Sequence, residues 1–162
     1  MAIADPTLAD FAVEWERYQD LLIGALAPLT AEQLELRAAP HLRSIGDIAT
    51  HIVGARARWL RRFLGEGGDD LDAIMPWDRA GQPPRTATEL VDGLRRTWAA
   101  LHACLERWTE ADLAQHIERQ YQGETESLSR RWVIWHLIEH DLHHGGEVSF
   151  SLGMHGLAAL DL

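Results

Sequence analysis

The chain contains no lysine and only one cysteine among its 162 residues. All 15 basic residues are arginines, which excludes Schiff-base catalysis and any other reaction that needs a lysine amine. The single cysteine, Cys104, cannot form an intramolecular disulfide, and this fits a reducing cytoplasm. Since leucines stand three residues before it and one after it, we expect Cys104 to be buried in a helix rather than to act as a reactive thiol.

Long apolar runs and an excess of positive charge are also missing. No run approaches the roughly 20 apolar residues that span a bilayer, and residues 1–6 lack the features of a signal peptide. The formal net charge of −10 disfavours non-specific binding to nucleic acid or to an anionic membrane. We therefore predict one cytoplasmic domain, residues 1–162, with a small-molecule substrate and with neither nucleic acid nor membrane as a partner.

Hydrophobic residues recur at three- and four-residue steps in four segments, which predicts four amphipathic helices and no clear strand. The segments cover about residues 8–26, 44–65, 86–105 and 127–145, and the last one extends as far as residue 152 in its longest form. The apolar positions of the first segment are Phe11, Trp15, Tyr18, Leu22 and Leu26.

Shorter signals connect these segments. Capping patterns predict short helical turns after Thr30 and Thr109, and residues 120–124 resemble a turn or a small hairpin. Residues 65–84 are rich in glycine, aspartate and proline, and their length suits a crossover or a functional loop. Trp77 within them caps either a pocket mouth or the end of the bundle. The fold class is therefore all-α, a four-helix bundle with a crossover connection and short extra turns.

Histidines are concentrated in the last predicted helix. His136, His140 and His144 recur at four-residue steps and share one face, with His143 beside them. Imidazole is the commonest side-chain ligand of transition metals, and two rings on adjacent turns can bind one ion. A catalytic site needs a third ligand, which must come from another segment.

His51 is the candidate for that third ligand, because it lies among the apolar residues of the second predicted helix. A lone histidine in such a place is more often a hydrogen-bonded core residue. Together, His51, His140 and His144 would form a three-histidine site with an open coordination position, as in catalytic metal sites. The alternative is a solvated helix face with incidental histidines.

The remaining histidines are expected to have lesser roles. We interpret His136 as a supporting or pocket-lining residue and His143 as a surface or supporting residue. Structural or exposed positions are expected for the rest, which are His41, His102, His116 and His155. The stretch from His140 to His144 also approximates the HExxH metalloprotease helix, with Asp141 in place of glutamate. The shorter aspartate and the missing downstream ligand disfavour a peptidase.

Three segments carry a resemblance to the DinB-like superfamily, also called the YfiT-like metalloenzymes. They are Ser44–His51, Tyr121–Glu124 and His140–Glu147. In that family the last segment often reads H-x-x-H-H-R-G-Q, whereas this chain has Gly145 at the arginine and Glu147 at the glutamine. The family's metal ligands correspond to His51, His140 and His144.

The resemblance implies a four-helix bundle that binds a divalent metal, most plausibly zinc or nickel, although three imidazoles also suit copper or iron. It also implies a homodimer and, for some members, a stress response. Characterised relatives include transferases and isomerases that use mycothiol or bacillithiol. Our leading hypothesis is a metal-dependent enzyme, either a thiol-dependent S-transferase or a hydrolase. The alternative is a non-catalytic metal-binding structural or stress-response interaction protein.

Two carboxylates are candidates for a general base or for support of the site. These are Asp141 and Glu147, and the competing interpretation for both is an exposed helix surface. Arg130 and Arg131, at the start of the last predicted helix, are candidates for contacting the carboxylates of a thiol cofactor, with simple exposure as the alternative.

Overall fold

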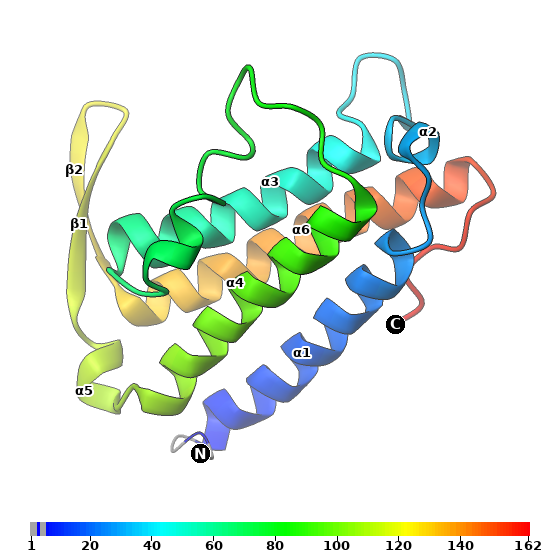
Figure 1. Ribbon diagram of the computed structural model, residues 1–162. Coiled ribbons are helices and arrows are strands. Elements are labelled where there is room, and N and C mark those ends of the chain that lie inside the picture. Colours follow the sequence, from blue (N-terminus) through cyan, green and yellow to red (C-terminus); the bar gives the residue numbers. More distant parts are fainter. Residues whose placement is uncertain (1–2, 4–5) are drawn as a thin grey trace.

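Four long helices lie side by side and account for most of the molecule (Figure 1). The computed structural model describes residue 3 and residues 6–162. The long helices are α1 (Pro6–Leu26), α3 (Ile45–Arg58), α4 (Ala87–Arg107) and α6 (Arg130–Met154). The all-α bundle predicted from the hydrophobic periodicity is confirmed.

Short elements connect the long helices. They are α2 (Ala31–Leu34), the π-helical turn η1 (Trp59–Phe63), the 3-10 turn η2 (Asp69–Leu71), α5 (Glu110–Leu113) and the strands β1 (His116–Tyr121) and β2 (Glu124–Ser129). Reciprocal capping boxes begin α2, α3, α4 and α5, each built from a serine or threonine and the residue three positions later. These caps hold backbone amides that the helix itself leaves unpaired.

The hairpin is longer than the sequence predicted. Each strand has six residues, whereas only a turn or small hairpin was expected around residues 120–124. Most strand residues are exposed and polar, so their period-2 pattern is weak. The turn itself follows a local rule, because Gln122 (φ 52°) and Gly123 (φ 87°) both adopt the positive φ that suits a two-residue hairpin.

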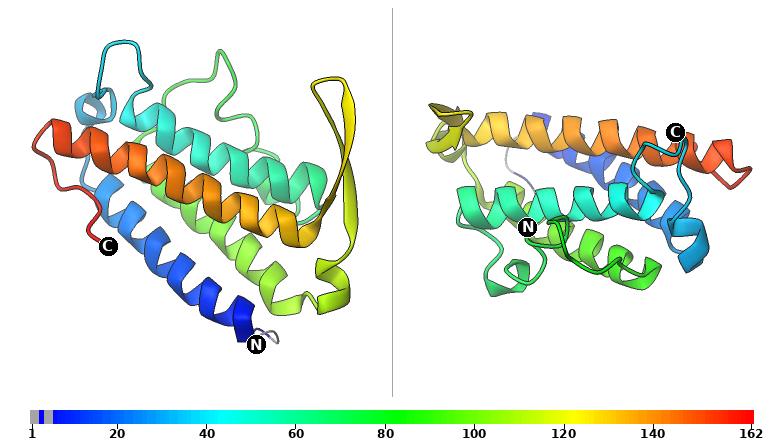
Figure 2. Two further views of the ribbon diagram at one scale, coloured as in Figure 1. Left: turned by 180° about the vertical axis from the view of Figure 1, so that it is seen from behind. Right: turned by 90° about the horizontal axis from the view of Figure 1, so that it is seen from above.

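The order of the helices in space requires a crossover. The most extensive contacts between long helices are those of α3 with α6, α1 with α4 and α3 with α4. Figure 1 shows that α3 and α4 run in the same direction, so residues 65–84 must carry the chain back along the bundle. The views in Figure 2 show this segment lying outside α3 and α4. The crossover predicted for these residues is confirmed.

The core lies between the four helices and is made mainly of fully buried leucine, isoleucine and valine. Cys104 is buried there, as predicted. One predicted apolar position of the first helix is wrong, because Phe11 is 57% exposed. The buried stripe of α1 passes through Ala12 and Trp15, which leaves Phe11 one residue off that face.

A buried ion pair crosses the core between α3 and α6. The side chains of Arg56 and Asp141 are both fully buried, and Arg56 Nη2 lies 2.7 Å from Asp141 Oδ2. The indole of Trp15 donates a second hydrogen bond to the same oxygen (2.6 Å), and Arg56 also donates to Gln19. Asp141 therefore does not lie on an exposed helix surface, which was the competing interpretation made from the sequence, and its carboxylate is paired with Arg56.

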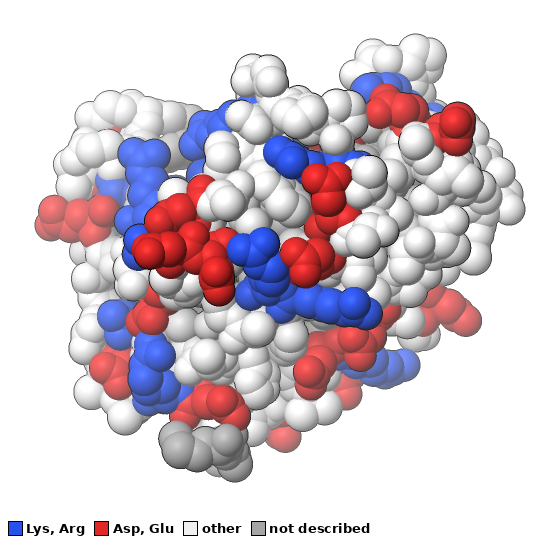
Figure 3. Space-filling model, in the orientation of Figure 1, with Lys and Arg blue, Asp and Glu red and all other residues white. Residues whose placement is uncertain are grey.

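On the face shown in Figure 3, arginine side chains lie interleaved with acidic ones.

None of the helices in the described part of the chain is long and apolar enough to cross a membrane.

Substitution at Gly145 tests the close contact between α6 and α1. A Cβ there would overlap the Tyr18 hydroxyl and lie 2.8 Å from its Cζ, and Tyr18 is buried. We expect Gly145→Ala to lower the free energy of unfolding by about 1–3 kcal/mol, measured by urea denaturation. Gly146→Ala is the matched control, because its Cβ would meet nothing within 4 Å. Equal effects of the two substitutions would contradict this account.

Candidate metal centre

Packing of α3 against α6 brings the three predicted histidines together. His51 comes from α3, and His140 and His144 come from successive turns of α6. The Nε2 atoms of His51 and His140 lie 3.1 Å apart, and the ring of His144 is 4.8 Å from that of His51 and 4.4 Å from that of His140. One nitrogen from each ring lies within 4.8 Å of the other two, so the cluster can hold a metal ion.

The environment favours the neutral form of His140 and His144. Burial, together with the neighbouring rings of His144 and His51, lowers the pKa of His140 to about 2. Burial also lowers the pKa of His144, although its hydrogen bond to Glu147 opposes the shift. A neutral imidazole has one nitrogen lone pair free for a metal, so the donor set fits a transition-metal ion.

Asp78 holds the His51 ring through the ring nitrogen that does not face His140. Nδ1–H of His51 donates to Oδ2 of Asp78 (2.8 Å), whose side chain is only 9% exposed. Arg58 donates to both oxygens of the same carboxylate, at 2.8 Å to Oδ2. Burial alone would raise the pKa of Asp78, but the hydrogen bonds from His51 and Arg58 hold it well below its usual range. The protonated Nδ1 leaves the lone pair of His51 on Nε2, which faces His140.

Two helix glycines make room for the loop that carries Asp78. A Cβ on Gly54 of α3 would lie 2.9 Å from Oδ1 of Asp78, and one on Gly93 of α4 would lie 2.8 Å from the ring of Trp77. The loop therefore sits against α3 and α4 where side chains are absent. Asp78 was not predicted from the sequence, where its only signals were these glycines within helices and the unusual length of the connection.

Glu147 contacts His144 on the other side of the cluster. Nδ1–H of His144 donates to Oε2 of Glu147 (2.7 Å), and Arg43 lies 3.4 Å from the same oxygen. Burial raises the pKa of Glu147, but these partners bring it below its ordinary value. His143, His144 and Glu147 form a second group that can hold a metal, although the side chain of His143 is 66% exposed.

The other residues singled out from the sequence lie outside the three-histidine cluster. The ring of His136 stacks on Trp132 (5.0 Å, 11° between planes), and its centroid is 6.0 Å from that of His140. Arg130 lies over the ring of Trp108, and Arg131 forms an ion pair with Glu110. Both guanidinium groups therefore have partners within the protein.

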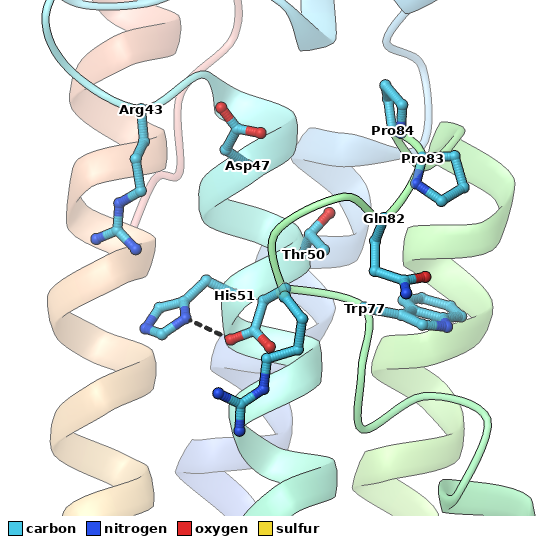
Figure 4. A pocket seen from close by; sticks show the side chains of 10 residues that line it. Arg43, Asp47, Thr50, His51, Trp77, Gln82, Pro83 and Pro84 are labelled. Atoms are coloured by element: carbon cyan, nitrogen blue, oxygen red, sulfur yellow. Dashed lines mark hydrogen bonds and ion pairs between the residues drawn. The ribbon is translucent and has the colours of Figure 1, made fainter.

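Two cavities adjoin the cluster. One of about 320 Å³ contacts the face of α6 and is lined by His136, Glu139, His140, His143 and His144. The other, of about 280 Å³, lies between α3 and the crossover segment (Figure 4). Its lining residues are Arg43, Asp47, Thr50, His51, Trp77, Asp78, Arg79, Gln82, Pro83 and Pro84. Trp77 therefore lines a cavity that His51 also lines.

Comparisons with known proteins agree with this architecture. The sequence model described as the DinB superfamily matches residues 14–148, a range that contains all three histidines. The crystal structure of a DinB-like protein from Bacillus cereus ATCC 10987 is similar, with a TM-score of 0.71 and 24% sequence identity, covering 94% of this chain and 95% of that one. No curated protein matches the chain. The structural similarity supports the fold.

Asp78→Asn tests the support of His51. Loss of the carboxylate charge removes the partner that fixes the His51 ring, and we expect the affinity for zinc to fall about 10- to 100-fold in a competition titration with a chromophoric chelator. Asp70→Asn is the control, because Asp70 is exposed on the same loop. Equal zinc affinity of Asp78→Asn and the unchanged protein would contradict the assigned role.

The stability of the metal-free protein should depend on pH. The pKa of His140 is about 2 in the folded chain and about 6.5 when unfolded, so the unfolded chain binds more protons between these values. We therefore expect the free energy of unfolding to fall as the pH is lowered from 6.5 to 4. The decrease should be smaller in His140→Leu, which can be followed by urea denaturation at several pH values. Parallel pH profiles would show that His140 does not cause the decrease.

Proposed function

The chain belongs to the DinB superfamily, and on that premise we propose that it is a metal-dependent enzyme whose ligands are His51, His140 and His144. The observation that supports this is the convergence of three imidazoles from two helices. Three imidazole donors suit a divalent transition metal, and zinc and nickel are the ions we propose.

We propose transfer to a low-molecular-weight thiol, such as mycothiol or bacillithiol, as the reaction class, with hydrolysis as the related alternative. A divalent ion in the cluster would lower the pKa of a thiol or a water molecule that reached it. The chain contributes the orientation of its ligands, because Asp78 holds His51 and Glu147 holds His144. The two adjoining cavities give a reactant access from either side.

A second candidate function, a non-catalytic metal-binding protein, is supported by the state of the carboxylates. Asp78 and Glu147 each accept a hydrogen bond from a histidine ring of the cluster, and Asp141 is paired with Arg56. Each of these acids therefore has a structural partner that competes with a role as general base. Activity measurements must distinguish the two functions.

Metal binding tests the ligand assignment. Protein purified without a histidine tag should bind about one zinc or nickel ion per chain. His140→Ala should lose that ion while keeping its helical circular dichroism, because the Arg56–Asp141 pair remains. His143→Ala is the matched control, since His143 belongs only to the second histidine group. Loss of metal in His143→Ala and retention in His140→Ala would reverse the assignment.

Turnover then distinguishes an enzyme from a metal-binding protein. The metal-loaded protein is mixed with a model electrophile and several low-molecular-weight thiols, and thioether formation is measured. The enzyme hypothesis predicts turnover that is lost together with the metal in His140→Ala. Full metal occupancy without turnover of any thiol or ester substrate would favour the non-catalytic function.

A further inference from the structure

We infer that the cavity between α3 and the crossover segment is a carboxylate-binding site, with Arg79 and Arg43 as the residues that recognise the anion. The inference rests on the proposed function and names its substrate class, a small carboxylate or a thiol that carries one. His51 lines the same cavity, so a ligand held there has access to the histidine cluster.

The two acidic residues of the cavity already have partners. Asp78 accepts hydrogen bonds from Arg58 and His51. Asp47 accepts hydrogen bonds from Arg37 (3.2 Å) and from the backbone amide of Ser44 (3.2 Å), which it caps at the start of α3. The negative charges of this cavity are therefore largely compensated within the chain.

The two arginines of the cavity are much less engaged. Arg79 is exposed, and its guanidinium has no side-chain partner within residues 3 and 6–162. Arg43 is 44% exposed, and its Nη2 lies 3.4 Å from Oε2 of Glu147 and 3.4 Å from Nδ1 of His144. A guanidinium presents parallel N–H donors that match the two oxygens of a carboxylate. In a chain of net charge −10, the unpaired guanidinium of Arg79 and the partly exposed one of Arg43 on the same cavity favour an anionic ligand.

Part of the remaining wall of the cavity is apolar and held in place. Trp77, Pro83 and Pro84 come from the crossover segment, and Figure 4 shows them across the cavity from Arg43. The Trp77 ring is fixed between Gly93 and the guanidinium of Arg85, which lies 4.7 Å from the ring centroid. An apolar wall opposite a cationic edge suits a carboxylate attached to a short hydrocarbon chain.

The carboxylate can belong to the thiol or to the molecule that the thiol attacks, and three probes separate these sources. Mercaptosuccinate has a thiol and two carboxylates, 2-mercaptoethanol has a thiol alone, and succinate has carboxylates alone. Cobalt-substituted protein reports thiol binding through its thiolate charge-transfer absorption. Metal-free protein reports succinate binding through the NMR signal of the Trp77 indole N–H, assigned with Trp77→Phe.

We expect Arg79→Gln to weaken mercaptosuccinate binding about tenfold, the size typical of a lost charge-assisted hydrogen bond. Binding of 2-mercaptoethanol should not change. Arg95→Gln is the matched control, because Arg95 is an exposed arginine of α4 that does not line the cavity. A carboxylate on the attacked molecule instead predicts that succinate shifts the Trp77 signal, and that Arg79→Gln abolishes the shift.

The inference is overturned if Arg79→Gln leaves the binding of both mercaptosuccinate and succinate unchanged, or if Arg95→Gln weakens them equally. Failure of the proposed function gives a different result. In that case no thiol produces a charge-transfer band in cobalt-treated protein, while the succinate arm in metal-free protein still tests the carboxylate site.

Discussion

The buried pair of Arg56 and Asp141 is the interaction on which the rest of the structure depends. Both side chains are fully buried, so neither charge can be left without the other at acceptable cost. Arg56 follows His51 by five residues on α3, and Asp141 directly follows His140 on α6. Sliding one helix along the other would break the pair. Asp141 also accepts a hydrogen bond from the indole of Trp15 on α1. The ion pair thus sets the register in which the histidines of α3 and α6 face each other.

The second constraint is the parallel direction of α3 and α4, which forces a long return segment between them. That segment is not only a connection, since Asp78 reaches His51 and Trp77 forms the wall of the adjoining cavity. Gly54 and Gly93 allow it to approach the helices closely. One loop therefore orients a candidate ligand and shapes the space in front of it. Loops placed on a rigid helical scaffold commonly combine such roles.

His51 and His144 are each held by a carboxylate, but the two carboxylates differ in their surroundings. Asp78 is nearly buried and bound by Arg58. Glu147 is 40% exposed and lies near the partly exposed side chain of Arg43. The carboxylate that holds His51 is therefore the less exposed of the two, although the His51 ring is itself more exposed (28%) than the His144 ring (10%). Histidine rings held by hydrogen-bonded carboxylates are a common arrangement around metal ions in proteins. Here that arrangement is built from residues of three different segments.

Local sequence patterns determined the four helices, their capping boxes and the stripe of His140 and His144, because each depends on residues only three or four positions apart. His51 could be proposed as their partner because it lies on the apolar face of its own helix. The roles of Asp141 and Asp78 were decided by tertiary structure alone. Asp141 has a potential partner 85 residues away and Asp78 one 27 residues away, and no local spacing distinguishes a buried, paired carboxylate from an exposed one. Periodicity specifies which face of a helix is buried, whereas packing decides which polar groups meet there.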